Sequence, residues 1–414
     1  MRGVCAKAVV VLGRKREVAA AGVRAALGLL ALSLPAAAQG YQDALGPGAE
    51  SRAFGGAVSA GARGASATFI NPAGLGLAER PEVYVGFGLS GTHRQASVDL
   101  DGEPGAEPGP PPIGSELELT PLPAFAAALP LTRWLVLGAH AAPAAFQGAA
   151  YEVDAEGTRV REARAMRLFE VGPDVAFLIP EEVLPGQLAL GVGYRVTFGA
   201  LHRFRSPSAG PADLHLDLTG ADGSTGRLGL QYSPIPELRI GLTAQGPVGT
   251  TMSAAEGTMG GEAVSDPETE WTFPSRYTAG VRADLDRYSL ALEYRFSDSS
   301  GELVYGADAG AGLPETRPGD VHSAHLGAEV RLSKADLEFP LRVGYTFESS
   351  FGSAGTLSSF DLPPAALHTV GLGGGVARRR WATNVALTGR LGGADGEALY
   401  EWSISADFLI RFDQ

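Results

Sequence analysis

Hydrophobic and polar residues alternate along most of this chain. From Gln187 to Phe198, one parity carries Leu188, Leu190, Val192, Tyr194, Val196 and Phe198, and the other carries Ala189, Gly191, Gly193, Arg195 and Thr197. Successive side chains of a β-strand point to opposite faces, so this segment predicts a strand with one hydrophobic face and one face of small or polar side chains. The same pattern recurs through most of the sequence after residue 81, which indicates an all-β protein.

Reading the chain with period two predicts fourteen strands. They lie at residues 82–91, 121–131, 134–146, 166–180, 187–200, 213–233, 237–253, 272–285, 287–298, 322–334, 339–349, 366–377, 380–392 and 400–412. Their cores suit the roughly 9–11 tilted residues that a strand needs to cross a bilayer. The last strand is amphipathic and carries an aromatic residue, Phe412, close to its end.

The connections between these strands alternate in length. Long segments (92–120, 147–165, 201–212, 254–271, 299–321 and 350–365) alternate with turns of one to six residues. Outer-membrane barrels have long extracellular loops, short periplasmic turns and an even strand number, whereas a soluble sandwich has no reason to make one rim long. We therefore expect a 14-stranded antiparallel transmembrane β-barrel at residues 82–414.

The amino end indicates export. Basic residues up to Arg24 precede an apolar stretch, Ala25–Leu34, which closes on Ala36-Ala37-Ala38. This order predicts a signal peptide at residues 1–38; the alternative, a stop-transfer anchor, needs about 20 apolar residues to span a bilayer. We therefore expect a protein of the outer membrane of a Gram-negative bacterium.

Composition narrows the possible partners. The single cysteine, Cys5, lies before the predicted cleavage point, so we expect no disulfide. A net charge of -13 argues against a nucleic-acid partner. The acidic residues gather in the predicted loops, where they keep exposed segments soluble; contacts with divalent cations or lipopolysaccharide are the other reading.

Residues 41–81 have a different character from the strands, because they are rich in Gly and Ala and contain few bulky side chains. Such a segment suits either a flexible linker or a plug that packs inside a narrow lumen. The run Ser66-Ala-Thr-Phe-Ile-Asn-Pro-Ala-Gly-Leu75 within it resembles the hatch signature of the FadL/TodX family, outer-membrane transporters of long-chain fatty acids and aromatic hydrocarbons. Further passages at 237–248, 273–281, 341–345 and 362–371 resemble that family in the same order.

The resemblance implies an N-terminal hatch at residues 39–81 inside the lumen, with Asn71, Pro72 and Ala73 in gating. Without the resemblance, these three residues read as an Asx-type turn that anchors the segment. The family also implies an inward kink in the third strand that opens the wall sideways. Here the candidates are Ala141, Ala142 and Pro143, since proline cannot donate to the ladder; a rim irregularity without a passage is the alternative.

The sequence motifs do not indicate an enzyme. The sequence has no Gly-x-Ser-x-Gly elbow, and His322 and His325 fall on opposite faces of a strand, which makes them a poor metal pair. We therefore predict no enzyme activity, no cofactor and no metal site. Eight charged residues on lumen-facing positions are expected to form an internal ion-pair network rather than an aqueous path: Arg195, Arg282, Glu293, Arg295, Glu329, Arg331, Arg342 and Glu348.

Together these points predict passive transport of hydrophobic small molecules. The partners would be an apolar ligand and the lipid and lipopolysaccharide of the outer membrane, and we expect a monomer. One rival is a FadL-like accessory barrel in protein secretion or surface assembly, and another is an open general porin.

Overall fold

The computed structural model describes residues 45–96, 112–155, 158–180, 182, 184–207, 212–298, 305–308, 319–350, 365–394 and 397–413. The predicted signal peptide, residues 1–38, lies outside the described residues. Within the described ranges, no helix has the length and apolar character needed to cross a membrane.

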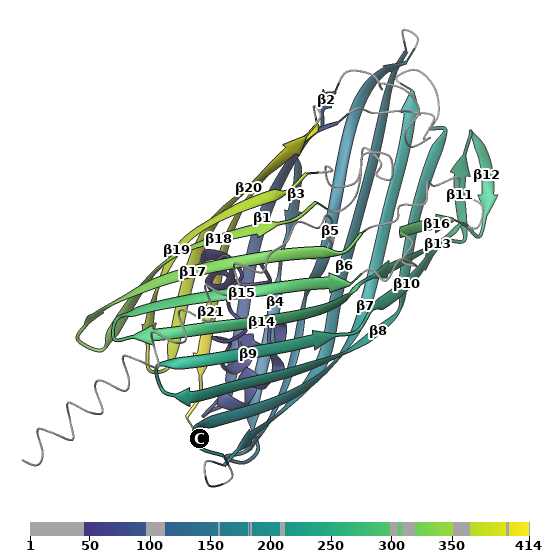
Figure 1. Ribbon diagram of the computed structural model, residues 1–414. Helices are drawn as coiled ribbons and strands as arrows, with labels where there is room; N and C mark the ends of the chain where they lie inside the picture. Colours follow the sequence, from purple (N-terminus) through teal and green to yellow (C-terminus); the bar gives the residue numbers. More distant parts are fainter. Residues whose placement is uncertain are drawn as a thin grey trace, which may run out of the picture.

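Three short helical segments come first, and strands make up most of the remainder (Figure 1). The elements are α2 (Ala49–Ala53), η1 (Gly64–Phe69), η2 (Pro72–Leu77), β1 (Glu82–Ala96), β2 (Ile113–Gly114), β3 (Glu118–Pro121), β4 (Ala124–Pro130), β5 (Leu135–Ala155), β6 (Thr158–Ile179), β7 (Gln187–Pro207), β8 (Leu214–Ile235), β9 (Leu238–Gln245), β10 (Val248–Ser253), β11 (Glu256–Met259), β12 (Glu262–Ser265), β13 (Glu268–Phe273), β14 (Ser275–Leu285), β15 (Tyr288–Asp298), β16 (Tyr305–Asp308), β17 (Val321–Lys334), β18 (Leu337–Glu348), β19 (Leu367–Arg378), β20 (Trp381–Ala394) and β21 (Glu397–Arg411).

Across the described residues, the strands close into a 14-stranded antiparallel barrel. Around the ring the order is β1, β4, β5, β6, β7, β8, β9, β14, β15, β17, β18, β19, β20 and β21. The last strand pairs with the first from Glu82↔Arg411 to Gln95↔Ala398, which removes the free edges. The strand count and the antiparallel arrangement predicted from the sequence are confirmed.

The wall is apolar outside and polar inside. On β7 the exposed side chains include Leu190, Val192 and Tyr194, whereas Arg195 and Thr197 of the opposite parity are buried. On β21, Ile404 is 54% exposed and its neighbour Ser405 only 4%. A water-soluble sheet has the reverse distribution, so the outer face is built to contact lipid.

Several predicted loops are wrong, because strands continue through them. The segment predicted as loop 147–165 is a hairpin: β5 runs to Ala155 and β6 starts at Thr158, with pairs such as Glu152↔Arg161. β7 likewise extends to Pro207, and β11, β12 and β13 occupy most of 254–271. Beyond the lipid band the outward residues are polar, so hydrophobic and polar residues no longer alternate there. The backbone hydrogen bonds between the strands nevertheless continue.

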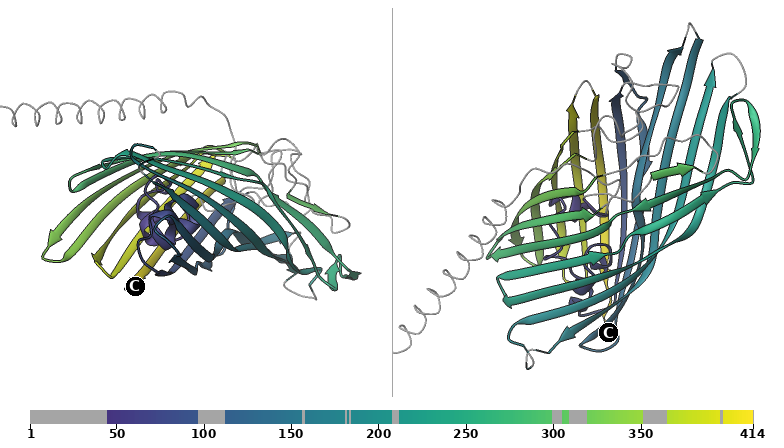
Figure 2. Two further views of the ribbon diagram at one scale, coloured as in Figure 1. Left: turned by 90° about the horizontal axis from the view of Figure 1, so that it is seen from below. Right: turned by 45° about the vertical axis from the view of Figure 1, so that its right-hand side comes forward.

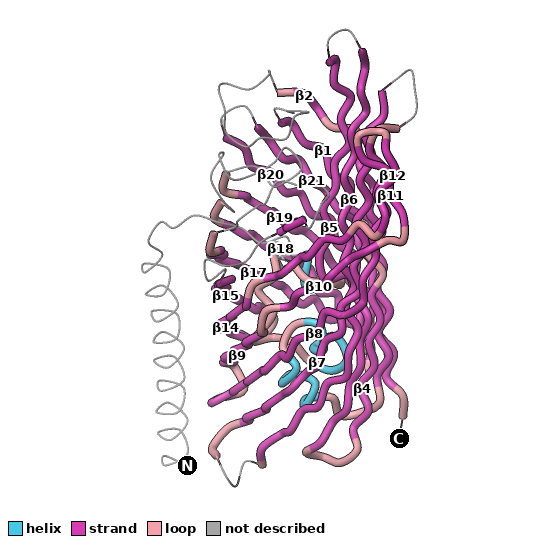
Figure 3. Tube along the Cα trace, turned by 90° about the vertical axis from the view of Figure 1, so that its right-hand side faces the viewer, coloured by secondary structure: helices cyan, strands magenta, loops and turns pink. Residues whose placement is uncertain are grey.

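Residues 45–81, here called the lumen segment, lie inside the barrel. Figure 2 draws the short helices on the concave side of the wall, and Figure 3 shows them among the strands in the half nearer the C terminus. α2 contacts β18–β21, η1 contacts β1, β4 and β5, and η2 contacts β5–β8. A single short segment reaches strands all around the ring only from within.

Candidate functional site: the filled lumen and the break in the wall

Glycines on the inner face of the wall provide the seat for the lumen segment. A Cβ atom on Gly344 would lie 2.0 Å from the Gly55 nitrogen, and one on Gly191 would lie 2.2 Å from the carbonyl carbon of Pro72. Glycines at 229, 241, 327 and 371 make similarly close approaches. The inward-facing positions of the strands therefore carry glycine and other small residues because the lumen segment packs directly against them.

Polar wall side chains satisfy the backbone of the lumen segment, which has little regular structure of its own. Glu82 accepts from the amide of Ala65 at 2.8 Å, and Glu293 accepts from the amide of Ser59 at 2.7 Å. Gln231 donates to the carbonyl oxygens of Ser59 and Ala62, each at 3.1 Å. Buried backbone groups need such partners, so these bonds hold the segment in one position.

Asn71 joins the lumen segment to the wall. Its side-chain oxygen accepts from the amide of Ala73 at 3.1 Å, which makes the Asx-type turn at the start of η2. Its side-chain nitrogen donates to the carbonyl oxygens of Ser59, at 3.0 Å, and of Leu230 on β8, at 3.1 Å. The fully buried amide thus ties two parts of the segment to one wall strand.

A polar cluster grips the segment at Thr68 and Phe69, and we call it the clamp; it consists of His140, Glu170, Asp174, Arg195 and Arg227. Arg195 bonds Asp174 at 3.0 Å and donates to the Thr68 carbonyl at 2.7 Å. Arg227 donates to the Phe69 carbonyl at 2.5 Å. Four neighbouring strands, β5 to β8, supply these side chains from their inner faces.

Outward from the clamp, on the same strands, the inner face becomes apolar. The buried cluster there, called the apolar cluster, comprises Ala145, Met166, Leu168, Leu201, Leu214, Leu216, Leu218, Val248, Met252, Trp271 and Phe273. On β6 the order of inward residues is Met166 and Leu168, then Glu170 and Asp174 of the clamp. The interior therefore holds an apolar layer above a charged layer.

The wall is irregular at the boundary between these two layers. β4 pairs with β5 from Pro130↔Val136 to Phe125↔Ala141, and in the described part of the chain no ladder pair follows on that side of β5. Beyond this gap, β5 is next bonded by the stretch between β2 and β3: the amide of Glu116 donates to the Ala150 carbonyl at 2.7 Å. On its other side β5 bulges against β6 between Pro143 and Ala145.

A cavity of about 50 Å³ lies just inside this irregularity. It is lined by Phe69 of the lumen segment, by Pro143 and Ala145 of the bulge, and by Leu168 and Phe273 of the apolar cluster, among others. A space of this size holds a water molecule or two, so an organic ligand has to displace side chains to enter. Flexible Met166 and Met252 suit such rearrangement.

A second cavity, of about 260 Å³, lies at the end of the barrel with the short turns. Ten of the residues that line it are charged, and they include Arg282 and Glu329, which pair at 3.4 Å. The cavity also touches Tyr84 and Ile70, so it borders the face of the lumen segment away from the apolar cluster. Residues of the lumen segment thus line both cavities.

The lumen charges form the predicted ion-pair network, and each of the eight has a partner. The pairs are Arg195–Asp174, Arg282–Glu329, Arg295–Glu293, Arg331–Glu329, Arg342–Glu329 and Arg390–Glu348. His322 and His325 point to opposite faces, as expected: His322 bonds the Tyr294 hydroxyl outside, and His325 bonds the Gly55 carbonyl inside.

The structure places the predicted site residues in two groups. Asn71, Pro72 and Ala73 lie together against Gly191 and Gly229, and Ala141, Ala142 and Pro143 lie at the wall irregularity. The sequence reading missed the apolar cluster, although Leu214, Leu216 and Leu218 alternate with polar residues at the outer end of a strand. Apolar residues there face the lumen and polar residues face outward, which is the reverse of the pattern in the lipid-facing part of the wall. This reversal was the signal in the sequence.

Solved structures share this architecture. A Pseudomonas aeruginosa FadL homologue matches with a TM-score of 0.70 and 10% identity, over 91% of this chain and 100% of the other. The Ralstonia pickettii toluene transporter TbuX matches with a TM-score of 0.62 and 19% identity, over 90% and 100%. The Pseudomonas putida toluene transporter TodX gives 0.64 and 16%, over the same shares.

The chain is thus a transmembrane β-barrel whose lumen is filled by the lumen segment, residues 45–81. More particularly, it has the fold of the FadL- and TodX-type channels, as the sequence resemblance implied. No protein-family model and no curated protein sequence matches the chain.

Proposed function

We propose that this protein is a passive, non-enzymatic outer-membrane route for hydrophobic small molecules. The observation that carries the proposal is the apolar cluster, which sits on the inside of a barrel whose other inward residues are mostly small or charged. Large apolar side chains such as Trp271, Phe273 and two methionines are not required to fill a polar barrel interior, so their grouping here suits an apolar ligand. The fold also occurs in toluene transporters, which supports the ligand class.

We further propose that the ligand leaves sideways through the break beside Ala141, Ala142 and Pro143. The missing ladder pairs after Phe125↔Ala141 and the bulge at Pro143 support an opening at that height. A sideways exit lets an apolar ligand pass from the cluster directly into lipid, without exposing its surface to water. A rim irregularity without a passage is the competing interpretation.

In this proposal residues 39–81 act as the hatch, and Asn71, Pro72 and Ala73 hold it shut. Asn71 supports such a role because its side chain bonds both the segment and the wall. A signal peptide at residues 1–38, a Gram-negative outer membrane rich in lipopolysaccharide, and a monomeric barrel complete the proposal. Long-chain fatty acids and monoaromatic hydrocarbons are the two ligand classes to test.

The test is uptake of labelled oleate and toluene by detergent-free proteoliposomes. The intact protein should accelerate uptake over empty vesicles, and Pro143→Val should lower it several-fold, because valine can donate to the ladder and regularise β5. Pro173→Val on β6 is the matched control, since Pro173 keeps its β5 partner Ala139 and interrupts only the β6–β7 ladder, away from the gap between β4 and β5. Equal uptake by empty vesicles and intact protein removes the proposal.

Two further measurements separate the rivals. Deleting residues 41–80 should make the barrel permeable to small sugars, whereas an intact protein that already passes sugars is a general porin. An intact barrel that passes neither sugars nor apolar ligands fits an accessory of secretion or surface assembly.

A further inference from the structure

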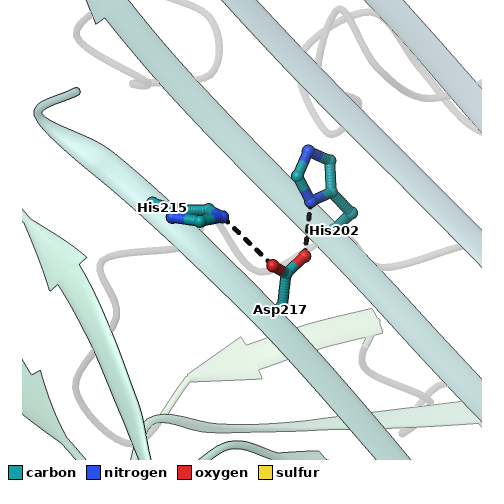
Figure 4. A group of neighbouring side chains, drawn as sticks. All are labelled: His202, His215 and Asp217. Carbon is teal, nitrogen blue, oxygen red and sulfur yellow. Dashed lines mark hydrogen bonds and ion pairs between the residues drawn. The ribbon is translucent and has the colours of Figure 1, made fainter.

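Three potential metal ligands meet on the outer face of the barrel, where β7 and β8 extend beyond the lipid band. They are His202 on β7 and His215 and Asp217 on β8 (Figure 4). His202 lies four residues beyond Phe198, roughly 13 Å along the strand at about 3.3 Å per residue. Phe198 is the last large exposed apolar residue of β7, so the group sits outside the apolar band.

Strand register brings the three side chains together. His202 is the direct cross-strand partner of Asp217, and His215 precedes Asp217 by two positions on the same face. The Nδ1 of His202 lies 2.5 Å from one carboxylate oxygen of Asp217, and the Nε2 of His215 lies 3.0 Å from the other. All three ligand atoms fall within 4.8 Å of one another. The ladder therefore holds the donors in place without a metal.

Aromatic contacts also hold the rings. The Phe204 ring stacks on His202 at a centroid distance of 6.4 Å and an angle of 9°, and it meets His215 edge-on at 6.1 Å. The charge of Asp217 is not neutralised by a guanidinium: among the described residues, its ion pairs are with the two histidines alone. A carboxylate between two imidazoles, each accessible to solvent, is a donor set suited to a divalent transition metal.

We propose that His202, His215 and Asp217 bind a divalent transition metal ion such as Zn²⁺ at the outer surface. Zinc takes imidazole nitrogen and carboxylate oxygen at about 2.0–2.2 Å, which puts tetrahedral donors roughly 3.3 Å apart. The present separations of 2.5 and 3.0 Å reach that spacing through small side-chain rotations. A fourth position remains for water. The site would also fasten β7 to β8 where they rise above the membrane.

The experiment is calorimetric titration of the full-length, detergent-solubilised protein, purified without a polyhistidine tag and stripped with EDTA. Zn²⁺ alone is the probe, and we expect saturable binding of one ion per chain. His202→Ala and His215→Ala should each weaken binding at least tenfold. His368→Ala is the control, because that histidine bonds Tyr345 elsewhere on the outer face and should leave the affinity unchanged.

Competition with calcium is one further result that decides the proposal. A hundredfold excess of Ca²⁺ should not displace Zn²⁺, because calcium prefers all-oxygen sites. Absence of saturable binding, equal affinity in the His202→Ala and His215→Ala variants, or displacement by Ca²⁺ overturns the proposal. Heat-dependent gel mobility checks that each variant is folded.

Discussion

Gly344→Ala is expected to unseat the lumen segment. The new methyl group would lie 2.0 Å from the Gly55 nitrogen and 2.3 Å from the Phe54 carbonyl carbon, against the 3.4 Å of ordinary contact. Both clashing atoms belong to backbone, so no side-chain rotation relieves them. The segment has to move away from β18 by more than an ångström.

The magnitude follows from the bonds that this movement breaks. The Gly55 carbonyl accepts from His325 at 2.8 Å and from Thr346 at 2.5 Å, and both lie beside the point of contact. Losing two hydrogen bonds costs about 1–3 kcal/mol, and overpacking costs about another 1–3 kcal/mol. The summed cost of about 2–6 kcal/mol raises the population of barrels with a displaced lumen segment by a factor of roughly 30 to 20,000, since about 1.4 kcal/mol is tenfold.

The assay is osmotic swelling of proteoliposomes in a small sugar, together with single-channel conductance. Wild type should be nearly impermeable, and Gly344→Ala should leak sugar and show discrete conductance steps. Gly389→Ala is the matched control, because nothing lies within 4 Å of a Cβ at that position. If Gly344→Ala folds normally and stays as tight as the Gly389→Ala control, the close-packed seat is not what closes the lumen.

Further predictions concern single residues of the interior. Asn71→Ala removes three hydrogen bonds and should raise sugar leakage by a factor on the order of ten or more. Asn71→Asp keeps the turn but sets a carboxylate oxygen against two carbonyl oxygens, so it should leak at least as much. Arg195→Met leaves Asp174 buried with one partner fewer, so it should destabilise the barrel by about 3–5 kcal/mol in urea titrations read by gel mobility; exposed Arg133→Met should not. Leu201→Asn puts an amide into the apolar cluster and should weaken ligand binding roughly tenfold, as measured by fluorescence competition; unchanged affinity places the ligand elsewhere.

The barrel was predictable because its physical signal is local. Each strand shows lipid on one side and the lumen on the other at alternate residues, so Leu190 and Arg195 indicate their faces without knowledge of any neighbour. The strand ends were not predictable in the same way. Above the lipid band the outward residues of β5 and β6 are polar or small, and the ladder that continues there is specified by pairing across the hairpin.

The interior could be predicted only in part. Gly and Ala enrichment indicated that residues 41–81 fit either a linker or a plug, but the matching wall glycines, such as Gly191 and Gly344, lie far apart in sequence. The grouping of His202 with Asp217 depends on the register between β7 and β8, which no local pattern reports. The expectation of no metal-ligand cluster rested on His322 and His325 and did not consider this pair.

Photolabelling with a diazirine-bearing fatty acid tests the central claim most directly, because the reagent marks the residues that it passes. After illumination and peptide mapping, the account predicts labels on Met166, Leu168 and the stretch 143–145, and unlabelled oleate should suppress them. Phe169, which faces lipid from the same strand, should be labelled without competition. Labels confined to lipid-facing residues, with none on Met166 or Leu168 in the interior, would contradict the proposed route.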